Sequence, residues 1–216
     1  MGAPICVNWL RLVCLFSFCV YLCLGFEYAN ILAAQDRPSL PASIQNLPLQ
    51  KVKLGDNSIT AKLTARADIT GFPCAAGYIT FAPSGNLMTF ALAEDANIQG
   101  NAIPKGTWVR LDEALKLKFC SFHKNTVIQS HLCRGNGGPK GVSTSFYPSG
   151  RLKGFFAPAN IDIQGIPCKA SHFGPIILFE NGGVKECTLS RAQTIGGKSL
   201  PKGTRVVLLE GGELLQ

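Results

Sequence analysis

The sequence predicts an all-β protein made of tandem β-hairpins. A short stretch that begins with isoleucine recurs along the chain, and its isoleucines lie 29, 30, 35 and 32 residues apart: Ile69, Ile98, Ile128, Ile163 and Ile195. Between these stretches, β-branched and aromatic residues lie on both sides of Gly-containing turns, which is typical of hairpins. No segment shows a sustained helical period with caps. A fixed period of this length indicates a repeat architecture.

Residues 1–34 are predicted to be a signal peptide for export that forms an N-terminal helix. An apolar run from Leu12 to Phe26 follows Arg11, and small residues lie at its end and beyond. The run suits the core of a signal peptide and is shorter than the ~20 residues that span a bilayer. An uncleaved anchor is the alternative. We therefore expect a secreted or periplasmic protein with no integral membrane domain after signal removal.

Residues 35–50 contain three prolines and no hydrophobic period, which predicts an extended linker. The repeat domain is then expected over residues 51–216. Six hairpins are expected in chain order, formed by residues 52–63, 78–92, 108–119, 142–156, 176–189 and 205–215. Gly85, Gly150 and Gly182 lie in three of their turns, where positive φ is needed and glycine adopts it at least cost.

The isoleucine-led stretches are expected to be connectors, each a turn that leads into the next hairpin. Together the segments give about five ~30-residue units and a terminal half-unit. Turns of two to four residues cannot join parallel strands, so the hairpins predict an elongated antiparallel meander. A closed barrel of about a dozen strands is the alternative architecture.

Two hairpins carry a family resemblance. Phe146-Tyr-Pro-Ser-Gly-Arg-Leu-Lys-Gly154 and Phe179-Glu-Asn-Gly-Gly-Val-Lys-Glu-Cys187 resemble MORN-type repeats and related bacterial antitoxin-like repeat proteins. The shared features are an aromatic residue, an Asn-Gly or Ser-Gly turn and a following apolar strand. The resemblance implies a β-meander used for protein or lipid contact, with no catalytic residues to carry over.

Five cysteines remain after signal removal, and an odd number leaves at least one thiol unpaired within the chain. They are Cys74, Cys120, Cys133, Cys168 and Cys187. Three of them end connectors, which favours small buried core residues. When the connectors are aligned on their prolines, however, Lys105 and Lys202 take the position that the cysteines hold in other units. A position that accepts lysine is expected near the surface, which predicts that the thiols are accessible and paired. The pairs weighed are Cys168 with Cys187 and Cys120 with Cys133.

A cluster in the third unit raises two chemical alternatives. Cys120, His123, His131 and Cys133 supply two thiols and two imidazoles, as in tetrahedral zinc sites, but their spacing matches no standard zinc motif. The second alternative is a small envelope hydrolase that uses His123, His131 and Cys133. Since the sequence contains no catalytic motif and no paired carboxylates, we expect no enzyme, metal or cofactor.

Positive charge gathers in the middle third of the chain. Residues 105–153 contain nine Lys/Arg against Asp112 and Glu113, so they carry +7 of the net +8. Lys116 and Lys118 alternate with Leu115, Leu117 and Phe119, which places both lysines on one solvated strand face. The candidate binding residues are Lys116, Lys118, Lys124, Arg134, Arg151 and Lys153.

Such a basic strip favours an anionic envelope component, such as lipopolysaccharide, teichoic polymers or phospholipid, or else a protein partner. Export excludes nucleic acid as the expected ligand. Ordinary solvated lysines are the alternative. The sequence therefore predicts an exported, non-enzymatic β-repeat protein that binds or scaffolds at the cell envelope.

Overall fold

The computed structural model describes residues 40–136, 138 and 141–215. The chain divides after Leu40 into two units, and only the second, Pro41–Gln216, is described almost completely. The predicted export signal, residues 1–34, lies outside the described residues. Within the described part, no helix is long and apolar enough to cross a bilayer.

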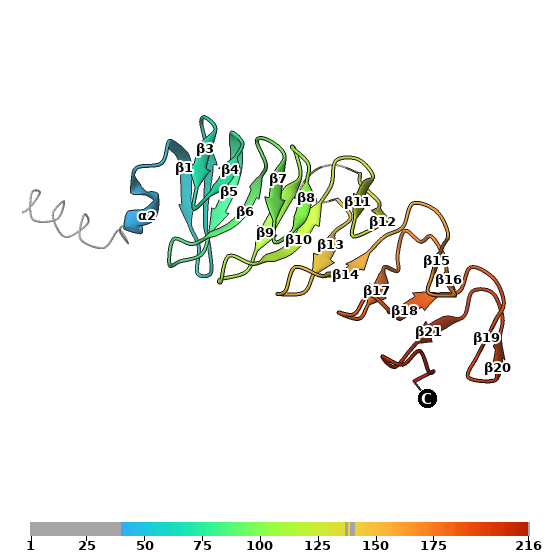
Figure 1. Ribbon diagram of the computed structural model, residues 1–216. Helices are drawn as coiled ribbons and strands as arrows, with labels where there is room; N and C mark the ends of the chain where they lie inside the picture. The colour runs from blue at the N-terminus through green and yellow to red at the C-terminus, as the bar shows by residue number, and fades with distance from the viewer. Residues whose placement is uncertain (1–39, 137, 139–140, 216) are drawn as a thin grey trace, which may run out of the picture. The chain divides into compact units, whose positions relative to one another are not determined.

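Eleven antiparallel strands form one continuous sheet in which sequence neighbours lie side by side (Figure 1). The strands are β1 (Leu49–Leu54), β2 (Ile59–Leu63), β5 (Gly77–Phe81), β6 (Leu87–Ala91), β9 (Trp108–Leu111), β10 (Leu117–Ser121), β13 (Thr144–Phe146), β14 (Leu152–Phe155), β17 (Ile176–Leu178), β18 (Val184–Thr188) and β21 (Arg205–Val207). The sheet is open, with β1 and β21 at its two edges. The predicted all-β meander is therefore confirmed, and the barrel alternative is wrong.

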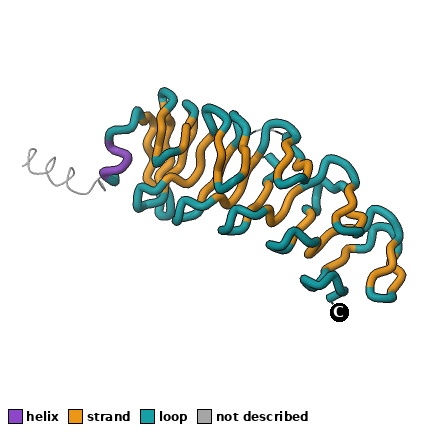
Figure 2. Tube along the Cα trace, in the orientation of Figure 1, coloured by secondary structure: helices purple, strands orange, loops and turns teal. Residues whose placement is uncertain are grey.

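Each connector is itself a two-stranded hairpin, where the sequence predicted only a turn (Figure 2). These side hairpins are β3 (Ala67–Ile69) with β4 (Phe72–Cys74), β7 (Ala96–Ile98) with β8 (Asn101–Ile103), β11 (Thr126–Ile128) with β12 (His131–Cys133), β15 (Ile161–Ile163) with β16 (Ile166–Cys168), and β19 (Gln193–Ile195) with β20 (Lys198–Leu200).

A two-residue turn closes every side hairpin. Both turn residues have positive φ in all five cases, as a type I′ turn requires: Thr70-Gly71, Gln99-Gly100, Gln129-Ser130, Gln164-Gly165 and Gly196-Gly197. This turn matches the twist of the strands on either side of it. The recurring isoleucine immediately precedes the turn, so it marks the end of the first strand.

The side hairpins bury their isoleucines against the sheet. Ile69, Ile98 and Ile128 have 2 to 6% of their surface exposed, and the isoleucines of the other side hairpins are also buried. Isolated bridges join the side hairpins to the sheet, Cys74 to Leu92 and Cys168 to Leu189. The core is therefore a layer between one face of the sheet and the side hairpins.

The cysteines lie inside this core. Cys74, Cys133 and Cys168 end the second strands of their side hairpins, and Ile103 and Leu200 hold the same register position in the other two. All five cysteines of the described part are buried, with 0 to 2% of their surface exposed. The prediction that these thiols are near the surface is wrong, because Lys105 and Lys202 lie two residues beyond this position.

A polar network ties the tips of two side hairpins to turns of the main sheet. The Gln99 amide donates to the Pro148 carbonyl (2.8 Å) and accepts from the Leu117 N–H (2.6 Å). In the next unit, the Gln129 amide accepts from the Leu152 N–H (3.0 Å) and donates to the Gly150 carbonyl (2.9 Å).

Buried Asn101 joins the two glutamines, because it donates to the Gln99 backbone carbonyl (3.2 Å) and accepts from the Gln129 amide (2.9 Å). Buried backbone groups need such partners. The glutamines thus fix where the side hairpins lie on the sheet.

The start of the described chain differs from the extended linker expected there. A one-turn helix, α2 (Ala42–Gln45), comes before β1, and its Ile44 is only 1% exposed. Pro41 and Ser43 lie against the Gly85 turn, where a Cβ on the glycine would come within 2.7 Å of Pro41 Cβ. This segment therefore packs onto the repeat domain.

Replacement of Gly150 by alanine should destabilise the protein more than the same change at Gly182. Both glycines have positive φ (86° and 89°) at the same turn position, so both substitutions cost ~1–2 kcal/mol. At Gly150 alone, the new Cβ would lie 2.8 Å from the Gln99 carbonyl oxygen, whereas Gly182 has no neighbour within 4 Å.

We expect Gly150→Ala to lose a further ~1–3 kcal/mol of unfolding free energy through overpacking, measured by urea denaturation. Equal losses in the two variants would contradict the packing of the side-hairpin tip on this turn.

Candidate binding surface

The face of the sheet away from the side hairpins carries a row of residues at equivalent β-bulges. In four successive main hairpins, the second strand has one extra residue that has no partner opposite it: Met88, Lys118, Lys153 and Lys185. Each follows a buried residue that faces the core, and the three lysines are exposed. The three lysines therefore form a row on the open face, one in each of three successive units.

An aromatic ring lies beneath each lysine of this row. The ammonium groups of Lys118, Lys153 and Lys185 lie 6.0, 5.5 and 5.6 Å from ring centroids, which belong to Phe119, Tyr147 and Phe179. Cation–π contacts of this length restrict the lysines at an exposed site. One strand lies between successive lysine-bearing strands, so the charges recur about every 10 Å across the sheet.

Phe119 lies on the same face as Lys118, although simple alternation placed them on opposite faces. Phe119 pairs with exposed Arg110, and the bulge at Lys118 shifts the register between Leu117 and Phe119. Since side chains alternate with period two, one extra residue reverses the face of everything that follows. The expected pairing of Lys116 with Lys118 on one strand face is also wrong, because β10 begins at Leu117 and Lys116 lies in the turn.

A shallow cavity of about 300 Å³ lies next to the lysine row. Its lining combines two half-buried aromatic rings, an exposed guanidinium and several hydroxyl groups: Thr89, Trp108, Val109, Arg110, Phe119, Ser121 and Ser143. An apolar wall with a few convergent polar groups is the usual composition of a ligand site. Composition alone did not single out Trp108 and Arg110, because only their strand register places them beside Phe119.

The structure separates the six basic residues predicted to form a strip. Lys118 and Lys153 belong to the row on the open face, and Lys116 and Arg151 are exposed in the turns of the same hairpins. Arg134 has a different environment, because its guanidinium donates to the carbonyls of Ala157 (3.0 Å) and Ser171 (3.1 Å). We therefore leave Arg134 out of the basic surface. Lys185 belongs to the row but lies outside the basic middle third.

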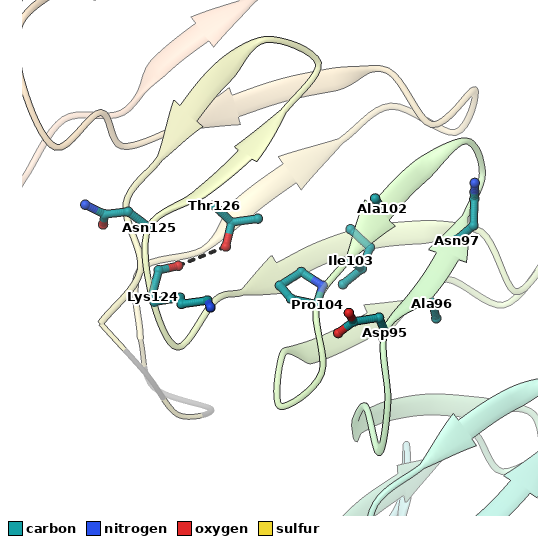
Figure 3. A pocket seen from close by; sticks show the side chains of 9 residues that line it. All are labelled: Asp95, Ala96, Asn97, Ala102, Ile103, Pro104, Lys124, Asn125 and Thr126. Carbon is teal, nitrogen blue, oxygen red and sulfur yellow. Dashed lines mark hydrogen bonds between the residues drawn. The ribbon is translucent and has the colours of Figure 1, made fainter.

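Lys124 lines another cavity, of about 420 Å³, beside the side hairpins β7–β8 and β11–β12 (Figure 3). The polar groups of this cavity already bond to their own loops. Asp95 accepts the Lys105 N–H (2.7 Å), and Asn125 accepts the Gly135 N–H (3.0 Å). In the next unit, Asn160 accepts the N–H of Ala170, which also lies ten residues further along the chain. These bonds therefore close the bases of side hairpins.

The Cys/His cluster of the third unit combines an exposed imidazole with a buried thiol. His123 is exposed, whereas Cys133 is fully buried, with its thiol directed at the His131 carbonyl oxygen (3.6 Å). Burial raises the pKa of Cys133 to about 12, and it also raises the pKa of Cys120. A protonated thiol is a weak nucleophile and a poor metal ligand.

His131 packs its ring on Phe155, with centroids 5.2 Å apart. Within the described residues, no group of three or more His, Cys, Asp or Glu side chains is placed to hold a metal ion.

Comparison with protein-family models, with curated proteins and with solved structures finds no match to this chain. The fold and the surface therefore define the class: a tandem β-hairpin repeat protein with one sheet face covered by side hairpins and the other open.

The stability of the folded chain should fall on acidification because of His131. Burial lowers the pKa of this imidazole below its ordinary value of 6.5. The unfolded chain therefore takes up a proton first as the pH falls through 6.5, and the folded state loses stability there.

We expect His131→Phe to reduce the loss of unfolding free energy between about pH 7.5 and about pH 5.5, measured by urea denaturation. His123→Gln, a change at an exposed histidine, serves as the matched control. If His131→Phe leaves the pH dependence as it is in the unaltered chain, the contribution of His131 is refuted.

Proposed function

We propose that the chain is an exported, non-enzymatic β-repeat protein that binds an anionic component of the cell envelope through the open sheet face. The observation that carries this proposal is the row of Lys118, Lys153 and Lys185 at equivalent bulges. A repeat that places one cation per unit in line suits a ligand that carries negative charges in series.

In the part of the chain that the structure describes, no lysine of the row forms an ion pair. Three ion pairs occur within the described residues, Arg66–Glu94, Arg191–Asp162 and Arg205–Glu186, and none includes a lysine of the row. Glu186 is the residue after Lys185 on β18, but its carboxylate pairs with Arg205 (2.6 Å). Asp112 and Glu113 line a cavity with Lys118 but form no ion pair with it. Exposed cations without an ion-pair partner attract anions from solution and favour their association.

The cavity beside the row supports a ligand with both polar and apolar parts. Trp108 and Phe119 offer ring surface, and Arg110 offers a planar donor that suits carboxylate or phosphate groups. Lys118 lies over the Phe119 ring, so a lysine of the row contacts a residue that lines the cavity. A phosphate or carboxylate on a polymer or headgroup is the chemistry that both features suit.

The large apolar residues with the greatest exposure lie outside the three strands that carry the lysine row, β10, β14 and β18. Val127 and Leu132 belong to the side hairpin β11–β12, and Phe173 lies in the loop before β17. Tyr78, 61% exposed, lies on the open face at β5. Membrane-inserting surfaces combine basic residues with exposed apolar ones on one face. We therefore propose contact with anionic groups at the surface of an envelope component.

The resemblance to MORN-type repeats is consistent with this proposal, since it implies a surface for protein or lipid contact. The alternative of a hydrolase has less support. Its thiol, Cys133, is buried with a raised pKa, and its two histidines differ in environment.

Replacement of the lysine row should weaken binding to anionic envelope extracts. The triple variant Lys118→Gln/Lys153→Gln/Lys185→Gln removes three charges from the open face. The matched control, Lys105→Gln/Lys169→Gln/Lys198→Gln, removes three exposed charges that lie beside or within side hairpins. Since a lysine near an anionic surface contributes ~1 kcal/mol, we expect the first triple to lose roughly 10–100-fold in affinity.

Binding is measured on immobilised teichoic or lipopolysaccharide polymer and, separately, on vesicles of anionic phospholipid. Increasing salt should weaken whichever interaction occurs, because exposed charges are screened. Equal losses in both triples, or no binding of the unaltered chain at low salt, would refute the role of the row.

A further inference from the structure

Cys168 and Cys187 meet inside the core of the fourth unit. Cys168 ends the side hairpin β15–β16, and Cys187 lies in the main strand β18 that follows it. Their Sγ atoms are 2.6 Å apart, and the two residues are 0% and 2% exposed. This separation is nearer to an S–S bond of about 2.05 Å than to the ~3.5–4.0 Å at which even smaller, unbonded carbon atoms pack.

The other units show that this pair is distinctive. Cys74 bridges to Leu92 as Cys168 bridges to Leu189, and Phe90 holds the position equivalent to Cys187. The corresponding pairs in register are Cys74 with Phe90, Ile103 with Cys120, Cys133 with Phe155, and Cys168 with Cys187. Each of the first three pairs combines one cysteine with one large apolar residue. Only the fourth places cysteine on both sides.

A pair of cysteines fills this position with less side-chain volume than cysteine and phenylalanine do. Protein interiors are closely packed, so two small thiols would leave space that the other units fill. A bond between the sulfur atoms brings the side hairpin and the sheet together at this point. Packing and the distance between sulfur atoms therefore favour the same arrangement.

We propose that Cys168 and Cys187 form a disulfide that fastens the side hairpin β15–β16 to the sheet. Its formation removes two electrons and two protons from the thiols, and the acceptor is a disulfide-bearing oxidant of the compartment. One cysteine thiolate attacks the disulfide of the oxidant, which breaks that bond, releases one oxidant sulfur as a thiolate and gives a mixed disulfide. The second cysteine thiolate attacks the cysteine sulfur of the mixed disulfide, so the second oxidant sulfur also leaves, and the two oxidant sulfurs take up the two protons as thiols.

The burial of the pair determines when the bond forms. Both sulfur atoms are buried in the folded chain, so the exchange takes place before β15–β16 packs on the sheet. Burial then shields the finished bond from reductants.

The three remaining cysteines of the described part stay reduced in this scheme. Burial raises the pKa of Cys74 and of Cys133 to about 12 in each case, which keeps both thiols protonated. Cys120 is opposite Ile103 in the corresponding pair of its own unit. Since a direct sulfur–sulfur contact in the described part joins Cys168 to Cys187, the proposal does not include the Cys120–Cys133 pair weighed from the sequence and predicts three free thiols.

The proposed disulfide stabilises the C-terminal units of the repeat array, which are held in place by contacts with their nearest neighbours. In repeat proteins each unit contacts only adjacent units, so terminal units open most easily. Cys168 and Cys187 are 19 residues apart, and a closed loop of this size restricts the unfolded chain appreciably. The link therefore protects the C-terminal units from local opening.

The test uses the chain purified from an oxidising compartment, alkylated without reduction and digested. We expect one peptide pair linked through Cys168 and Cys187, with alkyl groups on Cys74, Cys120 and Cys133. Recovery of Cys168 and Cys187 as alkylated thiols would overturn the proposal.

A thermal measurement gives an independent test. The unaltered chain, reduced in urea and refolded in the presence of reductant, should have a Tm roughly 5–10 °C below that of the oxidised chain. The variant Cys168→Ala/Cys187→Ala should show no response to this treatment, whereas Cys133→Ala, a change at an equivalent buried cysteine, should keep it. An unaltered chain whose Tm is insensitive to this treatment would overturn the proposal even if the double variant fails to fold.

Discussion

The structure depends on one requirement, that the apolar face of a long open sheet be covered. Eleven strands present buried side chains on one face, and a single-layer sheet cannot shield them from water. The chain meets this requirement locally, because each connector folds back as a side hairpin over the strands nearest to it. Two turn residues with positive φ make that reversal compact, and glutamines at two tips bond to the main turns below.

Covering one face in this way leaves the opposite face free for contact. Both the row of lysines and the cavity lined by Trp108 and Arg110 lie on that face. The bulges connect the covered face with the open one, since the extra residue in the second strand of four main hairpins points away from the core. A unit that repeats its fold therefore also repeats its surface, and Lys118, Lys153 and Lys185 follow from the same backbone feature.

The main hairpins could be predicted from the sequence because Ser-Gly and Asn-Gly turns separate strands long enough to show their pattern. The side hairpins could not, since their strands have three residues each and turn pairs such as Gln129-Ser130 carry little turn signal. Alignment on prolines placed Lys105 beside the cysteines, whereas strand register aligns Ile103 with them. Phe119 was assigned to the wrong face because a bulge adds one residue without any marker in the sequence.

The most direct measurement for the central claim is a lysine acetylation footprint with and without an anionic polymer of the envelope. Quantitative mass spectrometry then reports the protection of each lysine. Binding through the open face predicts protection of Lys118, Lys153 and Lys185, with Lys105, Lys169 and Lys198 acetylated at an unchanged rate. Protection confined to the lysines beside the side hairpins, or spread evenly over both sets, would contradict the account.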